Sequence, residues 1–215
     1  KLWNCSRFLM MNIENTNTII KFEKLDLNLF EVVDYWILSK LHRTIQEVNN
    51  HLNSYKLNEA IKIVYNFIWK DYCDWYIEFS KNRIYGDNDH ERIFVLSFGV
   101  HVLENILKLL HPYAPYITDE LWSHFNPDKN ILLHTEWPKS NNTLIEKDKE
   151  DEFNFIMEVI IAIRNMRSKL NISPKKTANL VCRGNKISTN LIKENSKYFK
   201  SLVKITNIKV GEDIV

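Results

Sequence analysis

The stretch that decides the fold runs from Leu29 to Ser54 and reads LFEVVDYWILSKLHRTIQEVNNHLNS. Its apolar residues recur at spacings of one, three and four positions, which places them on one stripe of an α-helix. A long helix with an apolar stripe has to bury that stripe against other elements, so the stretch predicts a helical bundle. The stripe consists of Trp36, Ile37, Leu41, Ile45, Val48 and Leu52.

Helices of the same kind are expected on both sides of this stretch. The chain has only four glycines and five prolines in 215 residues, which favours long helices over a many-stranded β fold. Residues 14–28 lack a regular period and are expected to form a loop. The sequence therefore predicts an antiparallel bundle over residues 1–126. Its other helices are expected at residues 1–13, 58–79, 90–110 and 116–124.

The pattern changes after Pro127. Residues 127–149 are expected to form a linker with a short strand at residues 131–133, and residues 150–215 a small basic extension. The predicted fold class is mainly α, an antiparallel helical bundle with a small α/β C-terminal extension. The extension alternates helix, strand, helix and strand, at about 150–170, 178–182, 189–203 and 205–210.

The net charge of +2 conceals an uneven distribution. Residues 153–215 carry twelve basic and four acidic side chains, a balance of +8, whereas residues 86–152 carry a balance of −7. A basic lobe of this kind favours a polyanionic partner such as RNA. Lysines that only keep a small terminal domain soluble would give the same balance, so charge alone leaves both interpretations open.

The chain contains no residue pattern for covalent chemistry. It has no glycine-rich phosphate loop, no HExxH pair and no histidine at metal-ligand spacing from a cysteine. Asp71, Asp74 and Glu78 fall on one helix face, but a solvated acidic face explains them as well as acid–base chemistry does. We therefore expect a binding function, with no catalytic residue, no metal and no cofactor in this chain.

The cysteines and the apolar runs favour a cytoplasmic protein. Cys5, Cys73 and Cys182 form no CxxC pair and are expected to be reduced thiols. No stretch approaches the roughly 20 apolar residues of a membrane span, and no signal peptide is recognisable. The chain opens inside an amphipathic pattern without an N-cap residue, so we expect its first residue to lie within a longer protein.

Two segments combine arginine with an amphipathic helix. Residues 1–8, KLWNCSRF, place Arg7 beside Phe8, and residues 163–167, IRNMR, place Arg164 and Arg167 on one helix face. An aromatic ring beside a guanidinium can hold an unstacked base. By spacing alone Phe8 also fits a core position, and the two arginines could pair with nearby acids, so both interpretations stay open.

An aromatic cluster marks the third expected helix. At about 100° per residue Trp69, Tyr72 and Tyr76 share one face, while Trp75 points about 120° away from Tyr72. The four rings could all fill the bundle, or one could be presented to a base or to a partner domain.

In the order of its motifs the chain resembles the anticodon-binding region of the class Ia aminoacyl-tRNA synthetases, and among them most closely the valyl-tRNA synthetases. The likeness covers nearly the whole chain, and the Lys-Leu-Trp-Asn and Asp-Trp-Tyr segments resemble the valyl branch more than the isoleucyl or leucyl branches. The segments are 1–4, 6–8, 34–38, 74–78, 111–112, 115–122, 137–138, 163–167 and 171–174.

The resemblance implies part of an ATP-dependent ligase that charges valine tRNA. The HIGH-like and KMSKS-like signatures of the family are absent from this sequence. The resemblance therefore implies that the catalytic and editing domains, with ATP and magnesium, belong to the parent protein, and that this chain has no aminoacylation activity alone. The implied partners are the anticodon stem-loop of valine tRNA and the catalytic domain of the parent, with the protein a monomer in the cytoplasm.

The resemblance also suggests the residues that contact tRNA. Phe8 is expected to stack on a base, which favours contact over the core position, and Lys1 and Arg7 to reach base edges or phosphates. Arg164 and Arg167 are expected to contact the RNA backbone or to serve packing between domains. Trp69, Asp74 and Trp75 are weaker candidates. Two alternatives stay open: a fragment of an isoleucyl-tRNA synthetase, or a non-catalytic helical scaffold for protein interactions.

Overall fold

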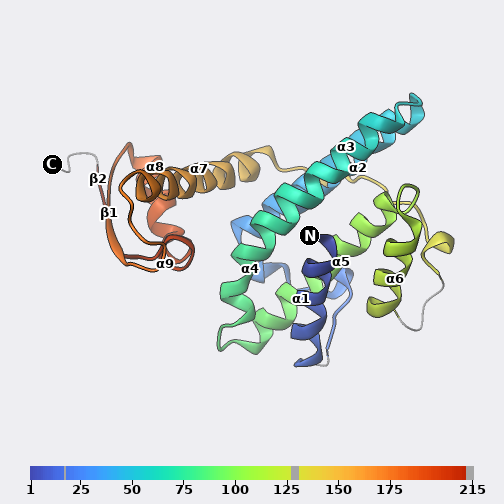
Figure 1. The fold of residues 1–215 in the computed structure, drawn as a ribbon, viewed down its shortest axis with the longest axis horizontal. Coiled ribbons are helices and arrows are strands. Elements are labelled where there is room, and N and C mark those ends of the chain that lie inside the picture. The colour runs from blue at the N-terminus through green and yellow to red at the C-terminus, as the bar shows by residue number, and fades with distance from the viewer. Residues whose placement is uncertain (17, 127–130, 212–215) are drawn as a thin grey trace. The chain divides into compact units, whose positions relative to one another are not determined.

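The computed structural model describes residues 1–16, 18–126 and 131–211 of the chain, which divides into two compact units, Lys1–Lys147 and Asp148–Val215. The first unit is a helical bundle, and the second combines helices with a two-stranded parallel sheet (Figure 1). The predicted fold class, a mainly α bundle with a small α/β extension, is confirmed.

The first unit consists of helices that pack around one apolar core. α5 lies at its centre. The expectation that no stretch approaches a membrane span is wrong for α5, which is long and apolar enough, but 67% of its most apolar window is buried inside the bundle, as in a core helix. α2 and α3 run side by side as a long hairpin (Figure 1). The helices of this unit are α1 (Leu2–Glu14), α2 (Val32–Asn53), α3 (Leu57–Asn66), α4 (Ile77–Ile84), α5 (Asp89–Leu110) and α6 (Pro115–Phe125).

A π-helix, Phe67–Tyr76, joins α3 to α4 within the helix that the sequence predicts over residues 58–79. Its i→i+5 hydrogen bonds give wider turns than an α-helix. Tyr72 and Tyr76 are buried and stacked, and the Tyr72 hydroxyl donates to the Gly99 carbonyl oxygen over 2.7 Å. Trp69 lies outside, with 38% of its surface exposed, so the prediction that it shares the face of the two tyrosines is wrong because the wider turn changes the period.

A buried ion pair connects α2 to α4. Arg83 Nη1 lies 2.5 Å from Asp34 Oδ2, and Arg83 Nη2 donates to the Leu29 carbonyl oxygen over 2.7 Å. The same carboxylate accepts from the Glu31 amide over 2.9 Å and so caps the first turn of α2. Burial is the main cause that raises the pKa of Asp34 to about 6, although the charge of Arg83 opposes it.

We expect protonation of Asp34 to raise the free energy of unfolding as the pH falls from 7 to 4. Its pKa is about 6 in the folded chain and near its ordinary value of 3.8 when unfolded, so the folded state takes up the proton first. This difference corresponds to about 3 kcal/mol. Between pH 7 and pH 4 the unfolding free energy of the parent chain should therefore rise relative to that of Asp34→Asn by about 2–2.5 kcal/mol, measured by urea unfolding at each pH.

Comparison with the variant removes contributions from other groups. Burial lowers the pKa of His101 to about 4, so that residue costs stability as the pH falls from 6.5, but it does so in both proteins. A difference between parent and variant that does not change with pH would contradict the expectation for Asp34.

The second unit begins with α7 (Lys147–Lys169) and continues as a strand, two helices and a strand. Strands β1 (Ala178–Arg183) and β2 (Ile205–Gly211) pair in parallel, and a parallel pair needs a crossover, which α8 (Lys186–Glu194) and α9 (Ser196–Val203) supply. The left-handed Lys204, with φ 53°, ends α9 and turns the chain into β2.

Two local expectations are wrong. Residues 132–134 form a 3-10 turn rather than a strand, because the Leu132 amide donates to Asp119 instead of to a neighbouring strand. The expected helix over 189–203 is two helices, α8 and α9, which meet at Asn195. Asn195 is the C-cap of α8, and its side chain donates to the Leu191 carbonyl oxygen. The loop expected over 14–28 is present in the described residues and contains two short 3-10 turns, Phe22–Lys24 and Leu27–Leu29.

The boundary between the two units falls at Lys147/Asp148, close to the end of the expected linker. Residues 127–130 of that linker lie outside the described residues. The finer division into domains at 1–126, 127–149 and 150–215 stays a prediction.

Candidate nucleic-acid interface

A groove of about 300 Å³ opens between α1, the π-helix and α4, and we call it the α1 groove. Two of the five predicted tRNA contacts, Lys1 and Phe8, line it, together with the weaker candidate Asp74. Apolar, acidic, basic and amide side chains all face this one space. The complete lining is Lys1, Asn4, Cys5, Phe8, Cys73, Asp74, Ile77, Glu78 and Lys81.

Lys1 stands at one end of the α1 groove in contact with two other predicted residues. Its Nζ lies 2.5 Å from Asp74 Oδ1 and 4.2 Å from the ring centroid of Trp69. Tyr65, which is also exposed, stacks on the Trp69 ring, with centroids 5.5 Å apart. Since Lys1 and Asp74 are both partly exposed, their ion pair adds little stability and can exchange with another partner at low cost.

Phe8 lies at the groove as a half-buried ring rather than in the core. The edge of the ring packs against Tyr85, at 6.2 Å between centroids and 81° between planes, and Lys81 Nζ lies 5.8 Å from the ring centroid. Tyr85 thus fixes the ring, and a ring that is fixed and partly open is suited to stacking. Arg7, the next residue back, is exposed on α1.

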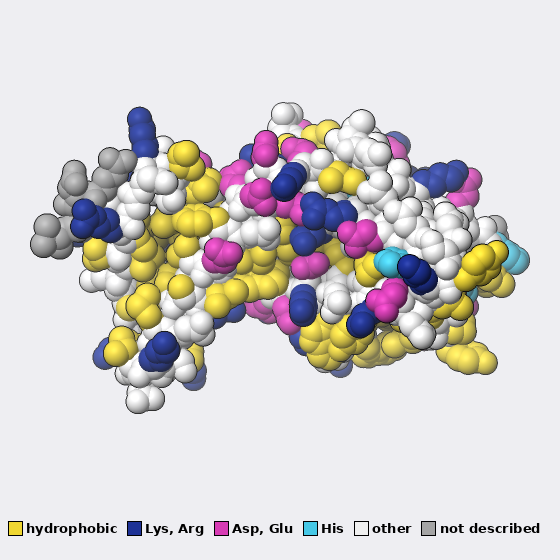
Figure 2. Space-filling model, turned by 90° about the horizontal axis from the view of Figure 1, so that it is seen from above, with side chains coloured by type: hydrophobic (Ala, Val, Ile, Leu, Met, Phe, Trp, Pro, Cys, Tyr) yellow, Lys and Arg dark blue, Asp and Glu magenta, His cyan; other side chains and the backbone are white. Residues whose placement is uncertain are grey.

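The charges around the α1 groove are mixed in sign. Glu78 pairs with Lys81, and Asp74 pairs with Lys1, so acids and bases alternate along the groove. Figure 2 shows Lys, Arg, Asp and Glu side chains interspersed in the same way on the face of the bundle that it draws. Carboxylates repel phosphate but accept hydrogen bonds from the amino groups of bases, so this arrangement suits base edges better than an RNA backbone.

Trp75 has no place in the α1 groove. It is half-buried and its ring packs against Phe79, with centroids 5.8 Å apart. The structure therefore brings Lys1, Phe8, Trp69 and Asp74 close to one another and leaves Trp75 apart from them.

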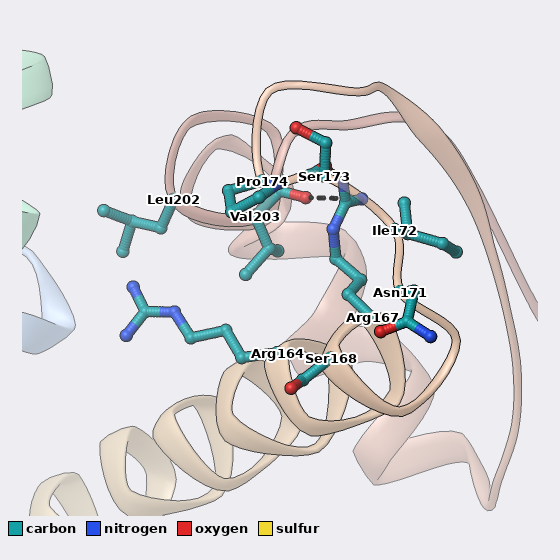
Figure 3. Close-up of a pocket in the computed structure, with 9 residues that line it drawn as sticks. All are labelled: Arg164, Arg167, Ser168, Asn171, Ile172, Ser173, Pro174, Leu202 and Val203. Atoms are coloured by element: carbon teal, nitrogen blue, oxygen red, sulfur yellow. Dashed lines mark hydrogen bonds between the residues drawn. The ribbon is translucent and has the colours of Figure 1, made fainter.

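In the second unit, Arg164 and Arg167 line a pocket of about 540 Å³ but point in different directions (Figure 3). Arg164 is exposed on α7, whereas Arg167 is buried. Arg167 donates to the carbonyl oxygens of Val203 over 3.3 Å, Ser173 over 2.8 Å, and Lys176. The prediction that both arginines share one exposed face is wrong, because the chain after α7 folds back over Arg167.

Sequence reasoning missed three side chains that shape the proposed surface. Tyr65 lies four positions before Trp69, and Lys81 lies four positions before Tyr85, so a search for helical i, i+4 neighbours of aromatic residues could have found them. No short-range pattern connects Tyr85 with Phe8, which are 77 positions apart.

The described residues contain no group of three or more His, Cys, Asp or Glu side chains that could hold a metal ion. The α1 groove and the Arg164 pocket thus offer stacking, hydrogen bonding and charge, which are the means of recognising a ligand without covalent chemistry.

Residues 34–182 match the family model described as the anticodon-binding domain of tRNA ligase. A valine–tRNA ligase of Fusobacterium nucleatum is 34% identical over the whole chain. A valine–tRNA ligase of Fervidobacterium nodosum is 36% identical over 99% of the chain. A valine–tRNA ligase of Thermotoga maritima is 35% identical over 87% of the chain.

The chain spans about a quarter of the length of these relatives, 24%, 23% and 21% respectively. The alignments with the first two relatives include helix α1, which lies outside the matched family model. Because the family model covers most of the sequence, from the first turn of α2 to β1, the chain belongs to the anticodon-binding domain family of tRNA ligases.

Proposed function

We propose that this chain is the anticodon-reading part of a valine–tRNA ligase and that it binds the anticodon stem-loop of valine tRNA. The observation that carries the proposal is the α1 groove, which combines a fixed, half-open aromatic ring at Phe8 with the charged pair Lys1–Asp74. Those are the two elements that recognition of an unstacked base requires, a stacking surface and hydrogen-bonding groups for the base edge.

In this proposal each predicted contact has its own part. Phe8 stacks on an anticodon base, and Arg7 reaches the adjacent phosphate or base edge from the exposed side of α1. Asp74 accepts a hydrogen bond from a base amino group, which releases Lys1 from its ion pair to a phosphate. Trp69 remains a weaker stacking candidate, held in place under Lys1.

The second unit contributes charge. Arg164 is exposed together with Lys169, Lys175 and Lys176, so these side chains form a basic surface that suits an RNA backbone. Arg167 enters the proposal only as a residue that shapes this surface, since its guanidinium is engaged with three carbonyl oxygens.

The parent protein, by the same proposal, ligates valine to its tRNA in the cytoplasm as a monomer. ATP and magnesium would bind outside this chain, in the catalytic domain of the parent protein. That domain would be the second partner of this chain, after the tRNA. Isoleucyl-tRNA ligase is the nearest alternative, because the branched amino acid enzymes share the anticodon-binding family.

The proposal is tested by titrating the 215-residue chain at low salt with a valine anticodon stem-loop and with the same RNA carrying a changed middle base. We expect the changed RNA to bind more weakly by about 1–3 kcal/mol. Equal affinities would contradict base reading, and tighter binding of an isoleucine stem-loop would favour the alternative enzyme.

Replacing Phe8 with alanine is expected to weaken binding of the valine stem-loop by about 1–3 kcal/mol, the contribution of one base–aromatic stack. Fluorescence anisotropy with labelled RNA measures the change, and circular dichroism checks that the variant is folded. The matched control is Tyr116→Ala on α6, where the ring is 92% exposed and distant in sequence from the α1 groove. Unchanged affinity in Phe8→Ala would remove Phe8 from the interface.

Replacing Arg164 with alanine is expected to reduce the slope of log affinity against log salt by about 0.7–0.9, the loss of one phosphate contact. The slope comes from titrations at several salt concentrations. Lys139→Ala serves as a control, since that side chain is 85% exposed in the first unit. An unaltered slope in Arg164→Ala would show that Arg164 does not contact phosphate.

A further inference from the structure

Two of the three cysteines meet at the floor of the α1 groove. Cys5 is buried on α1, and Cys73, in the π-helix, is partly exposed. Both side chains line the same cavity, and each thiol shifts the pKa of the other. The fold thus brings to one groove two thiols that are 68 positions apart in sequence.

The two thiols have unequal chemical character. The hydrogen bond from Cys5 is the main cause that lowers the pKa of Cys73, and burial and Asp74 oppose it while Lys1 supports it. The same hydrogen bond and burial raise the pKa of Cys5. Cys73 is therefore the better nucleophile and is open to a small reagent, and Cys5 is a protected thiol beside it.

We propose that Cys5 and Cys73 form a reversible redox pair, in which a peroxide oxidises Cys73 and Cys5 then closes a disulfide between α1 and the π-helix. In a reducing compartment such a disulfide is transient and acts as a modification rather than as a structural bond. The inference does not depend on RNA binding, since it concerns the thiols alone.

The reaction takes two balanced steps. The Cys73 thiolate attacks one oxygen of hydrogen peroxide, the O–O bond breaks, and the leaving hydroxide takes a proton to become water, which leaves a sulfenic acid on Cys73. The Cys5 sulfur then attacks the Cys73 sulfur, the S–O bond breaks, and the hydroxide leaves with the Cys5 proton as a second water. The two thiols lose two electrons, and the peroxide gains them.

Cys182 provides an internal control. It lies in β1 of the second unit, is partly exposed, and has a pKa raised by burial. A partly exposed thiol with a raised pKa carries less thiolate, so general accessibility cannot by itself make Cys182 as reactive as Cys73.

The experiment treats the reduced chain with hydrogen peroxide and follows it by intact mass and peptide mapping. The Cys182→Ser variant, which keeps the pair, should lose two hydrogen atoms, yield a Cys5–Cys73 cross-linked peptide, and regain both thiols with dithiothreitol. The Cys5→Ala variant keeps Cys73 but lacks the thiol that resolves its sulfenic acid, so dimedone should trap sulfenic acid on Cys73 in this variant and not in the Cys182→Ser variant.

Either of two results would overturn the proposal: a Cys182→Ser chain that keeps both thiols or links only between molecules, or a Cys5→Ala chain in which dimedone labels no Cys73. The first measurement uses a chain with both native groove cysteines, so it decides the question even if Cys5→Ala is poorly folded.

Discussion

Replacing Arg83 with methionine should lower the free energy of unfolding by about 3–5 kcal/mol. The side chain is 95% buried, and its guanidinium contacts Asp34 at 2.5 Å and the Leu29 carbonyl oxygen at 2.7 Å. Methionine fills a similar volume but leaves a carboxylate and a carbonyl oxygen without their donor. The loss of a buried partner is costly because the remaining charge stays away from water.

Urea unfolding followed by circular dichroism measures this effect. The matched control is Asp89→Asn, which breaks an ion pair with Arg92 at the surface, where the Asp89 side chain is 77% exposed. We expect that change to cost less than about 1 kcal/mol. Similar losses in the two variants would show that the Arg83 pair contributes no more than a surface pair.

Replacing Arg167 with methionine should destabilise the second unit by about 2–4 kcal/mol, because three carbonyl oxygens lose a charged donor. Those carbonyls belong to Ser173 and Lys176, after α7, and to Val203 at the end of α9. Arg167 thus joins two other segments of the unit to α7, and their attachment to α7 should weaken together.

Hydrogen exchange, read separately for residues 148–211 and for the bundle, measures this effect. Protection in the second unit should fall, whereas Arg164→Met, a change at the exposed arginine one turn earlier, should leave it within about 0.5 kcal/mol. Equal effects of the two variants would contradict the structural role of Arg167.

The fold was largely predictable from sequence because it depends on regular apolar stripes. The stripe from Trp36 to Leu52 predicts α2 correctly, and the alternation after Pro174 predicts the strands β1 and β2, although not that they pair in parallel. The π-helix was not predictable, since the search assumed an α-helical period, and in a wider turn the same residues face different directions.

The candidate site was predictable only where residues lie close in sequence. Phe8 and Arg7 are neighbours, but the contacts of Phe8 with Tyr85 and of Lys1 with Asp74 depend on how α1 packs against a later helix. The error at Arg167 has the same origin. Its spacing from Arg164 is correct for one helix face, but spacing does not show that a later loop covers half of that face.

The π-helix between α3 and α4 has a consequence for how this family can tolerate change in chain length. Elsewhere in the bundle, loss of one residue from a helix would turn every later side chain by about 100° and expose the core. Between Phe67 and Tyr76, loss of a residue could instead tighten a wide turn toward an ordinary α-helix, so that the helix on either side keeps its orientation. Single-residue gaps in alignments of relatives are therefore expected to gather in this segment, and relatives that carry them should present a different residue from Trp69 beside Lys1.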